Sequence, residues 1–339
     1  LPLVVAADGT VNGNVQSGWL HGAGTTSDGM RWAGRGNVGA KNIVGATASG
    51  GNVVAIARTG SGLQAHTSPD GGATWKPAGA LPSGISWAGM AATDEVVVVA
   101  STDGRTAFSS DAGETWKTAD TGLSKLAAID EVPGSDGVFV AVGGSQVALG
   151  STASGALDWQ IDTAPSPGKD LVAAAGVGSA VVVVDQGTGT ASTKAATIGG
   201  TWNTTPAPLP HRQSIIGAAG TDTAVAVPGK DQPGVVGSVV VIDSASSTVD
   251  LSPDITLTGP GTWPTSGVAA LPVEGSSSSN RPHFVEQCRG IFYIANGADS
   301  TDQAQVWTSA DVATQAVTST GWVTGIAGTV PADVVAIAC

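Results

Sequence analysis

Two stretches of the sequence, TSPDGGATWK at 67–76 and FSSDAGETWK at 108–117, carry Ser, Asp, Gly, Thr and Trp in the same order. The recurring acidic residue either performs chemistry or holds the chain together. A carboxylate accepts hydrogen bonds from the N–H groups of a tight turn, Ser and Thr do so more weakly, and Gly tolerates a positive φ. We therefore interpret the motif as a structural turn.

The motif belongs to a longer internal repeat. Aligned on the Trp, further copies are TTSDGMRW ending at Trp32, TASGALDW at Trp159 and TIGGTW at Trp202, and successive Trp residues are 43, 41, 43 and 43 positions apart. Weaker copies surround Asp250 and Asp311. The pattern indicates about seven units.

Each unit has the pattern of four short strands. In residues 87–117, the segments WAGMAA, VVVVA and RTAFSS are separated by turn residues, and a fourth strand is expected to begin at Thr115 and Trp116. The preceding unit repeats this order with IVGATA, NVVAIAR, LQAHTS and TWKPAG. Four strands in about 40–45 residues are typical of a propeller blade. The sequence thus predicts an all-β chain, a β-propeller of four-stranded blades.

The two ends of the chain suggest how the ring closes. The first residues, LPLVVAADG, are typical of a second strand. The last residues, GWVTGIAGTVPADVVAIAC, are typical of first strands. Trp322, like Trp87, is expected to precede a first strand. Terminal strands that complete one shared blade hide the sheet edges. We expect seven blades in a single domain, 1–339, while six or eight blades remain open.

The repeated residues resemble the Asp-box or BNR repeat. They are Ser68, Asp70, Gly72, Thr74 and Trp75, then Ser109, Asp111, Gly113, Thr115 and Trp116, with a shortened variant at Asp28 and Trp32. Ser154 and Thr197 replace the Asp in two later copies. A hydroxyl can replace a turn acceptor but not a catalytic carboxylate.

That family includes sialidases, xyloglucan-degrading glycosidases, sortilin-type receptors and plastid photosystem assembly factors. The resemblance implies that the box lies on the turn between the third and fourth strands of a blade. The Trp that follows is expected to bury its surface against the neighbouring strand or blade.

Composition excludes several classes of function. The formal charge is −13 with 14 Lys and Arg against 27 Asp and Glu, which argues against nucleic-acid binding. The longest apolar runs are strand-length, so no membrane-spanning segment is expected. His21, His66, His211 and His283 show no metal-binding spacing, and no cofactor motif is present, so we expect neither a metal nor a cofactor.

An enzyme remains the alternative. The resemblance to sialidases implies three arginines, a Tyr–Glu pair and an Asp acid, but the seven arginines cannot be placed on one face, and Tyr293 is the one tyrosine. A glycan-active hydrolase using paired carboxylates stays open. Its candidates are Glu286 and Asp299.

Half of the candidate binding residues lie in a variable insertion at about 252–283, because long loops on a rigid scaffold often bind partners, and the others lie near the start of the chain or just after the insertion. The alternatives are an insertion that touches nothing and Trp residues buried between blades. The candidates are Trp19, His21, Trp263, Arg281, His283 and Tyr293.

Cys288 and Cys339 permit one disulfide, or are two unrelated thiols. Because the sequence starts at Leu1, a leader has been removed or the chain is part of a longer one. We expect an extracellular, cell-envelope or virion location.

The leading hypothesis is a non-catalytic extracytoplasmic binding or scaffold propeller that presents loops to a protein or glycan partner. A structural component of a surface or virion assembly, such as a phage tail, suits its small and weakly charged residues. The hydrolase is the second hypothesis. An assembly factor similar to the photosystem helpers is the third, although the Arg patch that this resemblance implies is not found.

Overall fold

The computed structural model describes residues 3–14, 32–166, 168–202, 207–208, 215, 217–220, 225–227, 282–288, 291–296, 306–309, 322–325 and 334–338. All regular elements in these ranges are β-strands. They form seven antiparallel sheets, six with four strands and one with two. No helix in these ranges is long and apolar enough to cross a membrane.

Each sheet is called a blade here. Four consecutive strands form each of the blades 2 to 5. Blade 2 contains β4 (Ile43–Ser49), β5 (Asn52–Thr59), β6 (Gly62–Ser68) and β7 (Lys76–Ala80). Blade 3 contains β8 (Trp87–Ala92), β9 (Val97–Ser101), β10 (Arg105–Ser109) and β11 (Lys117–Asp120). Blade 4 contains β12 (Ala128–Glu131), β13 (Val138–Gly143), β14 (Gln146–Ser151) and β15 (Asp158–Asp162). Blade 5 contains β16 (Leu171–Val177), β17 (Ala180–Asp185), β18 (Thr190–Ala195) and β19 (Ala207–Pro208).

Blades 6 and 7 follow in the chain, and blade 1 joins both ends of it. Blade 6 is described as β20 (Ala219–Gly220) and β21 (Val225–Ala226). Blade 7 contains β22 (Pro282–Cys288), β23 (Ile291–Asn296), β24 (Val306–Ser309) and β25 (Trp322–Gly325). Blade 1 has the order β26 (Val334–Ala338), β1 (Leu3–Ala6), β2 (Thr10–Asn14) and β3 (Trp32–Asn37).

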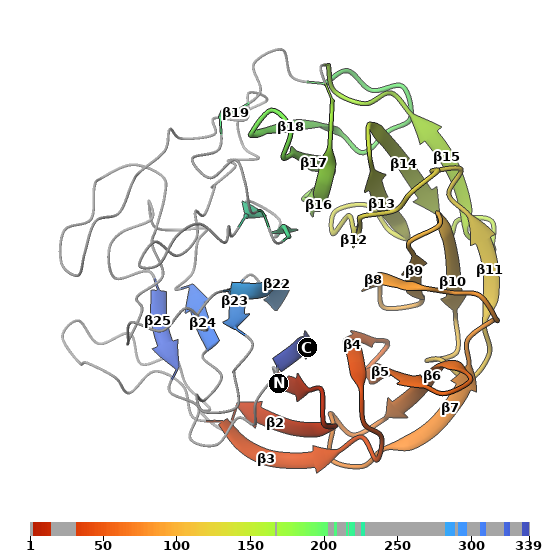
Figure 1. Ribbon diagram of the computed structural model, residues 1–339, viewed down its shortest axis with the longest axis vertical. Coiled ribbons are helices and arrows are strands. Elements are labelled where there is room, and N and C mark those ends of the chain that lie inside the picture. The colour runs from red at the N-terminus through yellow and green to blue at the C-terminus, as the bar shows by residue number, and fades with distance from the viewer. Residues whose placement is uncertain are drawn as a thin grey trace.

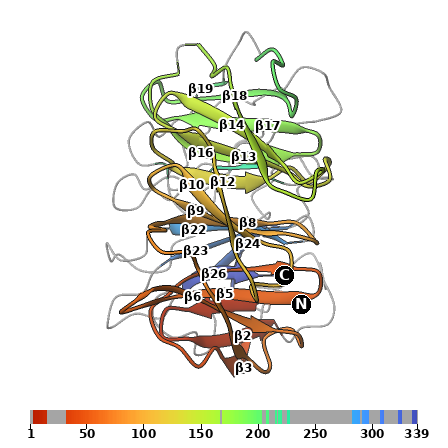
Figure 2. The same cartoon turned by 90° about the vertical axis from the view of Figure 1, so that its right-hand side faces the viewer.

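The blades form a closed ring. Contacts join the first strands in turn, β26 to β4, β8, β12, β16, β20, β22 and back to β26. Figure 1 shows these strands around a central axis, with both marked chain ends close to it. In the view turned by 90°, the described strands of successive blades lie one above another (Figure 2). The expected all-β propeller is confirmed.

Strand β26 closes the ring by pairing antiparallel with β1, with Leu3 opposite Ala338 and Val5 opposite Ala336. The expectation that terminal strands share one blade is confirmed. The assignment of Trp322 to a first strand is wrong, because Trp322–Gly325 is β25, the outermost strand of blade 7. Trp87 does begin a first strand, β8.

The second strand of each well-described blade is sandwiched between neighbours. Val97–Ser101 is buried throughout, and Val181–Val184 in β17 are all fully buried. Such short Val runs suit strands that are covered on both faces. The fourth strands are mostly exposed, as Lys76–Ala80 and Lys117–Asp120 show. Both of these strands begin one residue after the Trp rather than at it.

Apolar clusters fill the spaces between successive blades from blade 1 to blade 6. Val54, Ile56 and Leu63 of blade 2 pack with Val97 and Val99 of blade 3. Comparable clusters join blades 1 and 2, 3 and 4, 4 and 5, and 5 and 6. The core is therefore distributed around the ring rather than gathered at one centre.

Candidate functional site

Antiparallel strands place two kinds of turn on one face of the ring. The turn between the first and second strands and the turn between the third and fourth strands lie at the same end of a four-stranded blade. In blade 2 these are residues 50–51 and 69–75. We call this side the box-turn face, because the repeated Ser-Asp-Gly-Thr-Trp motif lies on it.

The turn of blade 2 is organised by one carboxylate. Asp70 Oδ1 accepts hydrogen bonds from the N–H groups of Ala73 (3.0 Å) and Thr74 (2.8 Å) and from Ser68 Oγ (2.9 Å). Asp70 Oδ2 accepts one from Thr74 Oγ1 (2.6 Å), and Ser68 Oγ accepts one from Gly72 N (2.8 Å). The hydrogen bonds from Thr74, helped by those from Ser68 and Ala73, lower the pKa of Asp70 to about 2. At neutral pH this carboxylate is therefore ionised, and both of its oxygens accept hydrogen bonds within its own turn.

Blade 3 repeats the arrangement. Asp111 Oδ1 accepts hydrogen bonds from Ser109 Oγ (2.7 Å) and Thr115 N (2.8 Å), and Gly113 N donates to Ser109 Oγ (2.8 Å). Burial, the largest single influence, raises the pKa of Asp111, but hydrogen bonds from Thr115, Ser109 and Glu114 together lower it. Neither Asp is free to act as an acid or base.

The same turns join neighbouring blades. A Cβ on Gly72 would lie 2.9 Å from Leu3 Cδ1 and 3.0 Å from Val11 Cγ1, both in blade 1. Gly79 N in β7 donates to Gly113 O (2.7 Å) in the turn of blade 3. Arg35 Nη2 in β3 donates to Asp70 O (3.0 Å), and Arg35 Nε donates to Gly71 O. Each box turn therefore fits against the second to fourth strands of the preceding blade.

The Trp residues strengthen these junctions. Trp75 Nε1 donates to Gly72 O and Trp116 Nε1 to Gly113 O, each at 3.0 Å. Trp75 packs against the cluster between blades 1 and 2, and Trp116 against that between blades 2 and 3. Each half-buried indole therefore covers part of its surface against the apolar residues between two blades, as a large aromatic side chain is expected to do.

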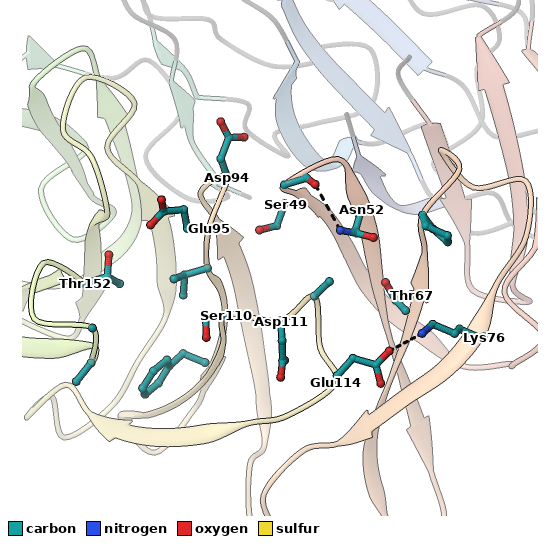
Figure 3. Close-up of a pocket in the computed structure, with 17 residues that line it drawn as sticks. Ser49, Asn52, Thr67, Lys76, Asp94, Glu95, Ser110, Asp111, Glu114 and Thr152 are labelled. Carbon is teal, nitrogen blue, oxygen red and sulfur yellow. Dashed lines mark hydrogen bonds and ion pairs between the residues drawn. The ribbon is translucent and has the colours of Figure 1, made fainter.

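A cavity of about 710 Å³ opens on the box-turn face and spans blades 2, 3 and 4 (Figure 3). We call it the inter-blade cavity. Its lining combines first-to-second-strand turns with third-to-fourth-strand turns. It comprises Ser49, Gly50, Asn52, Thr67, Pro69, Lys76, Asp94, Glu95, Val96, Phe108, Ser110, Asp111, Ala112, Glu114, Thr152, Gly155 and Ala156.

Some charged groups of the inter-blade cavity have hydrogen-bond or ion-pair partners and others have none among the described residues. Asp111 is held in its turn, and Glu114 Oε1 pairs with Lys76 Nζ at 2.6 Å. Asp94 and Glu95 lie on the exposed turn between β8 and β9. Within the ranges that the structure describes, their carboxylates accept no hydrogen bond and form no ion pair. They give the cavity two uncommitted negative charges.

The inter-blade cavity also contains an unpaired buried hydroxyl. Thr67 in β6 is 3% exposed, and its Oγ1 has no hydrogen-bond partner. Figure 3 labels Thr67 among the polar residues that line the cavity. An unpaired buried hydroxyl costs about 1–3 kcal/mol, so most such groups have a partner.

A second hollow, of about 410 Å³, is lined by the first strands around the ring axis, mostly by Ala, Gly and Thr. We call it the axial channel. Asp94 and Ser49 line both hollows. Burial, and to a smaller extent the charge of Asp94, raise the pKa of Glu131 in this axial channel from 4.5 to about 7. Glu131 is therefore a titratable group near neutral pH.

The structure places few of the predicted binding residues. His283 lies in β22 and Tyr293 in β23, so the last two positions of the insertion assigned to 252–283 belong to a strand. Glu286 and Cys288 also lie in β22. The remaining predicted residues, Trp19, His21, Asp28, Trp263, Arg281, Asp299 and Cys339, lie outside the described residues, so the disulfide stays a prediction.

Sequence reasoning missed the inter-blade cavity. The sequence pattern predicts residues 93–95 only as turn residues between two strands, and Thr67 only as part of the strand LQAHTS and of the repeated motif. The one available signal was the pair of adjacent acids, Asp94 and Glu95, on a turn facing the repeated motif. Among the described residues, no three His, Cys, Asp or Glu side chains converge to hold a metal ion.

Comparison with known proteins supports the fold alone. No protein-family model matches the sequence, and no curated protein matches it. Solved propeller structures do match. The computationally designed Ika8 protein has 14% identity and a TM-score of 0.56, covering 93% of this chain and 82% of its own.

Two natural propellers give similar scores. A chain of the nidogen/laminin complex has 14% identity and a TM-score of 0.50, covering 74% of this chain and 91% of its own. Human WBSCR16 has 10% identity and a TM-score of 0.51, covering 91% of this chain and 88% of its own. By its fold the chain is a β-propeller protein.

Proposed function

We propose that this protein is a non-catalytic binding or scaffold propeller of the Asp-box type, acting outside the cytoplasm as part of a larger surface or virion assembly. The proposal rests on a difference between two sets of acidic residues. The carboxylates of the repeated Asp70 and Asp111 accept hydrogen bonds within their own turns, whereas Asp94 and Glu95 in the inter-blade cavity accept none from the described residues. A rigid ring that presents such a hollow is suited to binding a partner.

Two further features support binding rather than hydrolysis. Arg35 and Arg105 are engaged by backbone carbonyls and by Asp103, so neither is available for an arginine cluster that would bind a substrate carboxylate. The nidogen chain was solved in a complex with laminin, which shows a propeller engaged with a protein partner. The proposed partner is a protein, and a glycan is the alternative ligand.

Site-specific photo-crosslinking tests the proposed function. Benzoylphenylalanine replaces Ser110 at the inter-blade cavity or, as a control, Ser61 on the opposite face between β5 and β6. Each variant is incubated with secreted and envelope fractions of the source organism. We expect a discrete crosslinked protein from position 110 and none from position 61. Crosslinking from neither position, or from position 61 alone, would contradict a binding role for this face.

One observation favours a second candidate, a glycan-active hydrolase that uses paired carboxylates. Glu131, whose pKa is raised to about 7, and Asp94 both line the axial channel, and glycoside hydrolysis uses two carboxyl groups of which the general acid has a raised pKa. A panel of polysaccharides and aryl glycosides tests it. Turnover that disappears in Glu131→Gln, with unchanged thermal stability below pH 5, would favour the hydrolase.

A further inference from the structure

The strand register of two neighbouring blades brings a lysine and an aspartate together. Asp162 in β15 lies opposite Val147, and Lys194 in β18 lies opposite Val181. Residues directly opposite each other in an antiparallel pair point to the same face of the sheet. Both valines belong to the apolar cluster between blades 4 and 5, so Asp162 and Lys194 enter that space from its two sides.

The pair is almost completely removed from water. Both side chains are buried, and Lys194 Nζ donates a hydrogen bond to Asp162 Oδ2. The Trp202 ring lies over Nζ, and Trp202 Nε1 donates to Thr163 O (2.6 Å), which covers this side of the pair. Ions that have lost their hydration are high in free energy, so a reaction that removes both charges is more favourable here than in water.

The two carboxylate oxygens of Asp162 have different environments. Oδ1 accepts hydrogen bonds from the N–H groups of Thr163 (2.7 Å) and Gly199 (3.1 Å), whereas Oδ2 faces the amine of Lys194. Fixed backbone N–H donors of this kind stabilise the negative oxygen of a tetrahedral intermediate in acyl transfer. Oδ1 is therefore placed to become an amide oxygen, and Oδ2 is placed to leave.

Lys194 is held as a nucleophile would be. Its Nζ also donates to Thr197 O (2.9 Å), which fixes the end of the side chain. Because Oδ2 is bonded to Cγ of Asp162, a nitrogen in contact with Oδ2 is also close to the carbon that it would attack. Such preorganisation replaces an encounter between two groups in solution.

From this geometry we propose that Lys194 and Asp162 condense to an intramolecular isopeptide bond, which joins β18 of blade 5 to β15 of blade 4. A proton passes from Nζ to Oδ2, the neutral amine attacks Cγ, and the Nζ–Cγ bond forms while the Cγ–Oδ2 bond breaks. Oδ2 leaves as water with two of the three ammonium protons, and the third proton stays on the amide nitrogen. The reaction needs no oxidant, cofactor or second substrate.

The bond is expected to form slowly, after the chain has folded. Burial raises the pKa of Asp162, but hydrogen bonds from Lys194, Thr163 and Gly199 together lower it, so the ion pair is the prevailing state. Condensation proceeds only from the neutral amine and the neutral acid, which form a minor population. The freshly folded chain is therefore expected to contain the ion pair, and the linked chain is expected to accumulate with time.

Mass spectrometry of the native chain tests this inference. The intact mass is measured on freshly purified protein and after days at physiological temperature, and each sample is fully unfolded before measurement. We expect a growing fraction that is lighter by one water molecule, in which a fragment containing Asp162 is joined to a fragment containing Lys194. The bond also closes a loop between positions 32 apart, so the thermal midpoint of the linked chain is expected to rise by about 5 °C.

Two controls distinguish this bond from other changes. The pair of Lys76 and Glu114 has the same functional groups but is exposed to solvent, so it is expected to stay unlinked. A succinimide at an Asp-Gly step, such as Asp103-Gly104, would lose the same mass. Mild alkali opens a succinimide and leaves an amide bond intact.

Lys194→Arg is the matched variant. It keeps a cation beside Asp162, but its guanidinium stays protonated and does not act as a nucleophile. We expect this variant to keep its full mass throughout the same incubation. Circular dichroism verifies that it is folded.

The native chain alone decides the outcome. An unchanged mass, a lost water located elsewhere in the chain, or the same loss in folded Lys194→Arg would overturn the isopeptide bond. A joined fragment from the native chain would support it even if Lys194→Arg does not fold. The inference goes beyond the proposed function and is independent of the photo-crosslinking result.

Discussion

Blades 2, 3 and 5 each use a carboxylate to hold the turn between the third and fourth strands, but the carboxylate does not come from the same place in all three. In blades 2 and 3 the carboxylate belongs to the turn itself, through Asp70 and Asp111. In blade 5 it comes from the preceding blade, because Asp162 of β15 accepts a hydrogen bond from Gly199 N (3.1 Å). The junction between blades is therefore what the fold requires, and the source of the acceptor can change.

Asp162 is held by a buried cation. Lys194 Nζ in β18 donates to Asp162 Oδ2 and to Thr197 O (2.9 Å), and it lies 5.4 Å from the centre of the Trp202 ring. The side chains of Asp162 and Lys194 are 1% and 0% exposed. Thr197, expected to replace the Asp as acceptor, contributes its backbone carbonyl to this link.

The turn of blade 4 is intermediate. Ser154 Oγ accepts a hydrogen bond from Ala156 N (3.3 Å) and donates to Asp158 Oδ2 (2.6 Å). Trp159 Nε1 donates to Thr106 Oγ1 (3.2 Å) in blade 3 rather than to its own turn. In this blade the hydrogen-bond acceptor of the indole therefore belongs to the neighbouring blade.

The largest effect is expected from breaking the buried pair. Asp162→Ala leaves Lys194 buried without a counter-charge, and removing one partner of such a pair costs about 3–5 kcal/mol of unfolding free energy. Urea unfolding measures the loss. Asp136→Ala, at an exposed position on the turn between β12 and β13, is the control, and Asp162→Leu with Lys194→Met is expected to recover most of the loss. Equal stability of Asp162→Ala and the native chain would show that the pair of Asp162 and Lys194 does not stabilise the junction between blades 4 and 5.

Packing of the turn glycines gives the next largest effect. Gly72 (φ +83°) and Gly155 (φ +77°) have similar backbones, but only Gly72 has neighbours that a Cβ would strike. We expect Gly72→Ala to cost about 2–3 kcal/mol through overpacking and backbone strain, and Gly155→Ala about 1 kcal/mol through strain alone. Thermal unfolding compares the two. Similar losses would mean that the fit of the blade 2 turn against blade 1 contributes little.

The internal carboxylate predicts a pH effect in blade 2. The pKa of Asp70 is lowered from 3.8 to about 2, so its contribution to stability is complete above pH 3.8 and is lost as the pH falls toward 2. Asp70→Asn is expected to lower the unfolding midpoint at neutral pH and to flatten its fall below pH 4. Asp136→Asn serves as the exposed control. Parallel pH curves for Asp70→Asn and the native chain would contradict this assignment.

The smallest effect concerns one strained residue. Ala112 has φ +53° where blade 2 has Gly71 at φ +64°. Ala112→Gly is expected to stabilise the chain by about 0.5–1 kcal/mol by relieving the left-handed strain, and Gly71→Ala to destabilise it by a similar amount. Differential scanning calorimetry of both variants measures the two shifts, which should be opposite in sign.

Much of the fold could be predicted because one local motif recurs at a fixed interval. The Trp spacing located the blades, and the Val runs located their second strands. The sequence predicts the wrong strand for Trp322 because the residues before it depart from the repeated motif, so nothing local marks the place of Trp322–Gly325 in its blade. The link from Asp162 to Lys194 was missed because it joins side chains of different repeats.

The candidate site could not be predicted for a related reason. Its residues come from turns of three blades, and proximity between them exists only once the ring is formed. Asp94 and Glu95 are unremarkable on an exposed turn, and the lack of a partner for Thr67 is a property of packing. Repetition in the sequence therefore predicts the scaffold, whereas binding depends on residues that differ from one repeat to the next.

The pairing of β26 with β1 has a consequence for synthesis. Val334–Ala338 leaves the ribosome long after Leu3–Ala6, so blade 1 keeps an unpaired edge, with the apolar Leu3 and Val5, while the rest of the chain is being made. An open edge of this kind can recruit another nascent chain. Translation that stalls before residue 334 is therefore expected to release an open ring that is prone to aggregate.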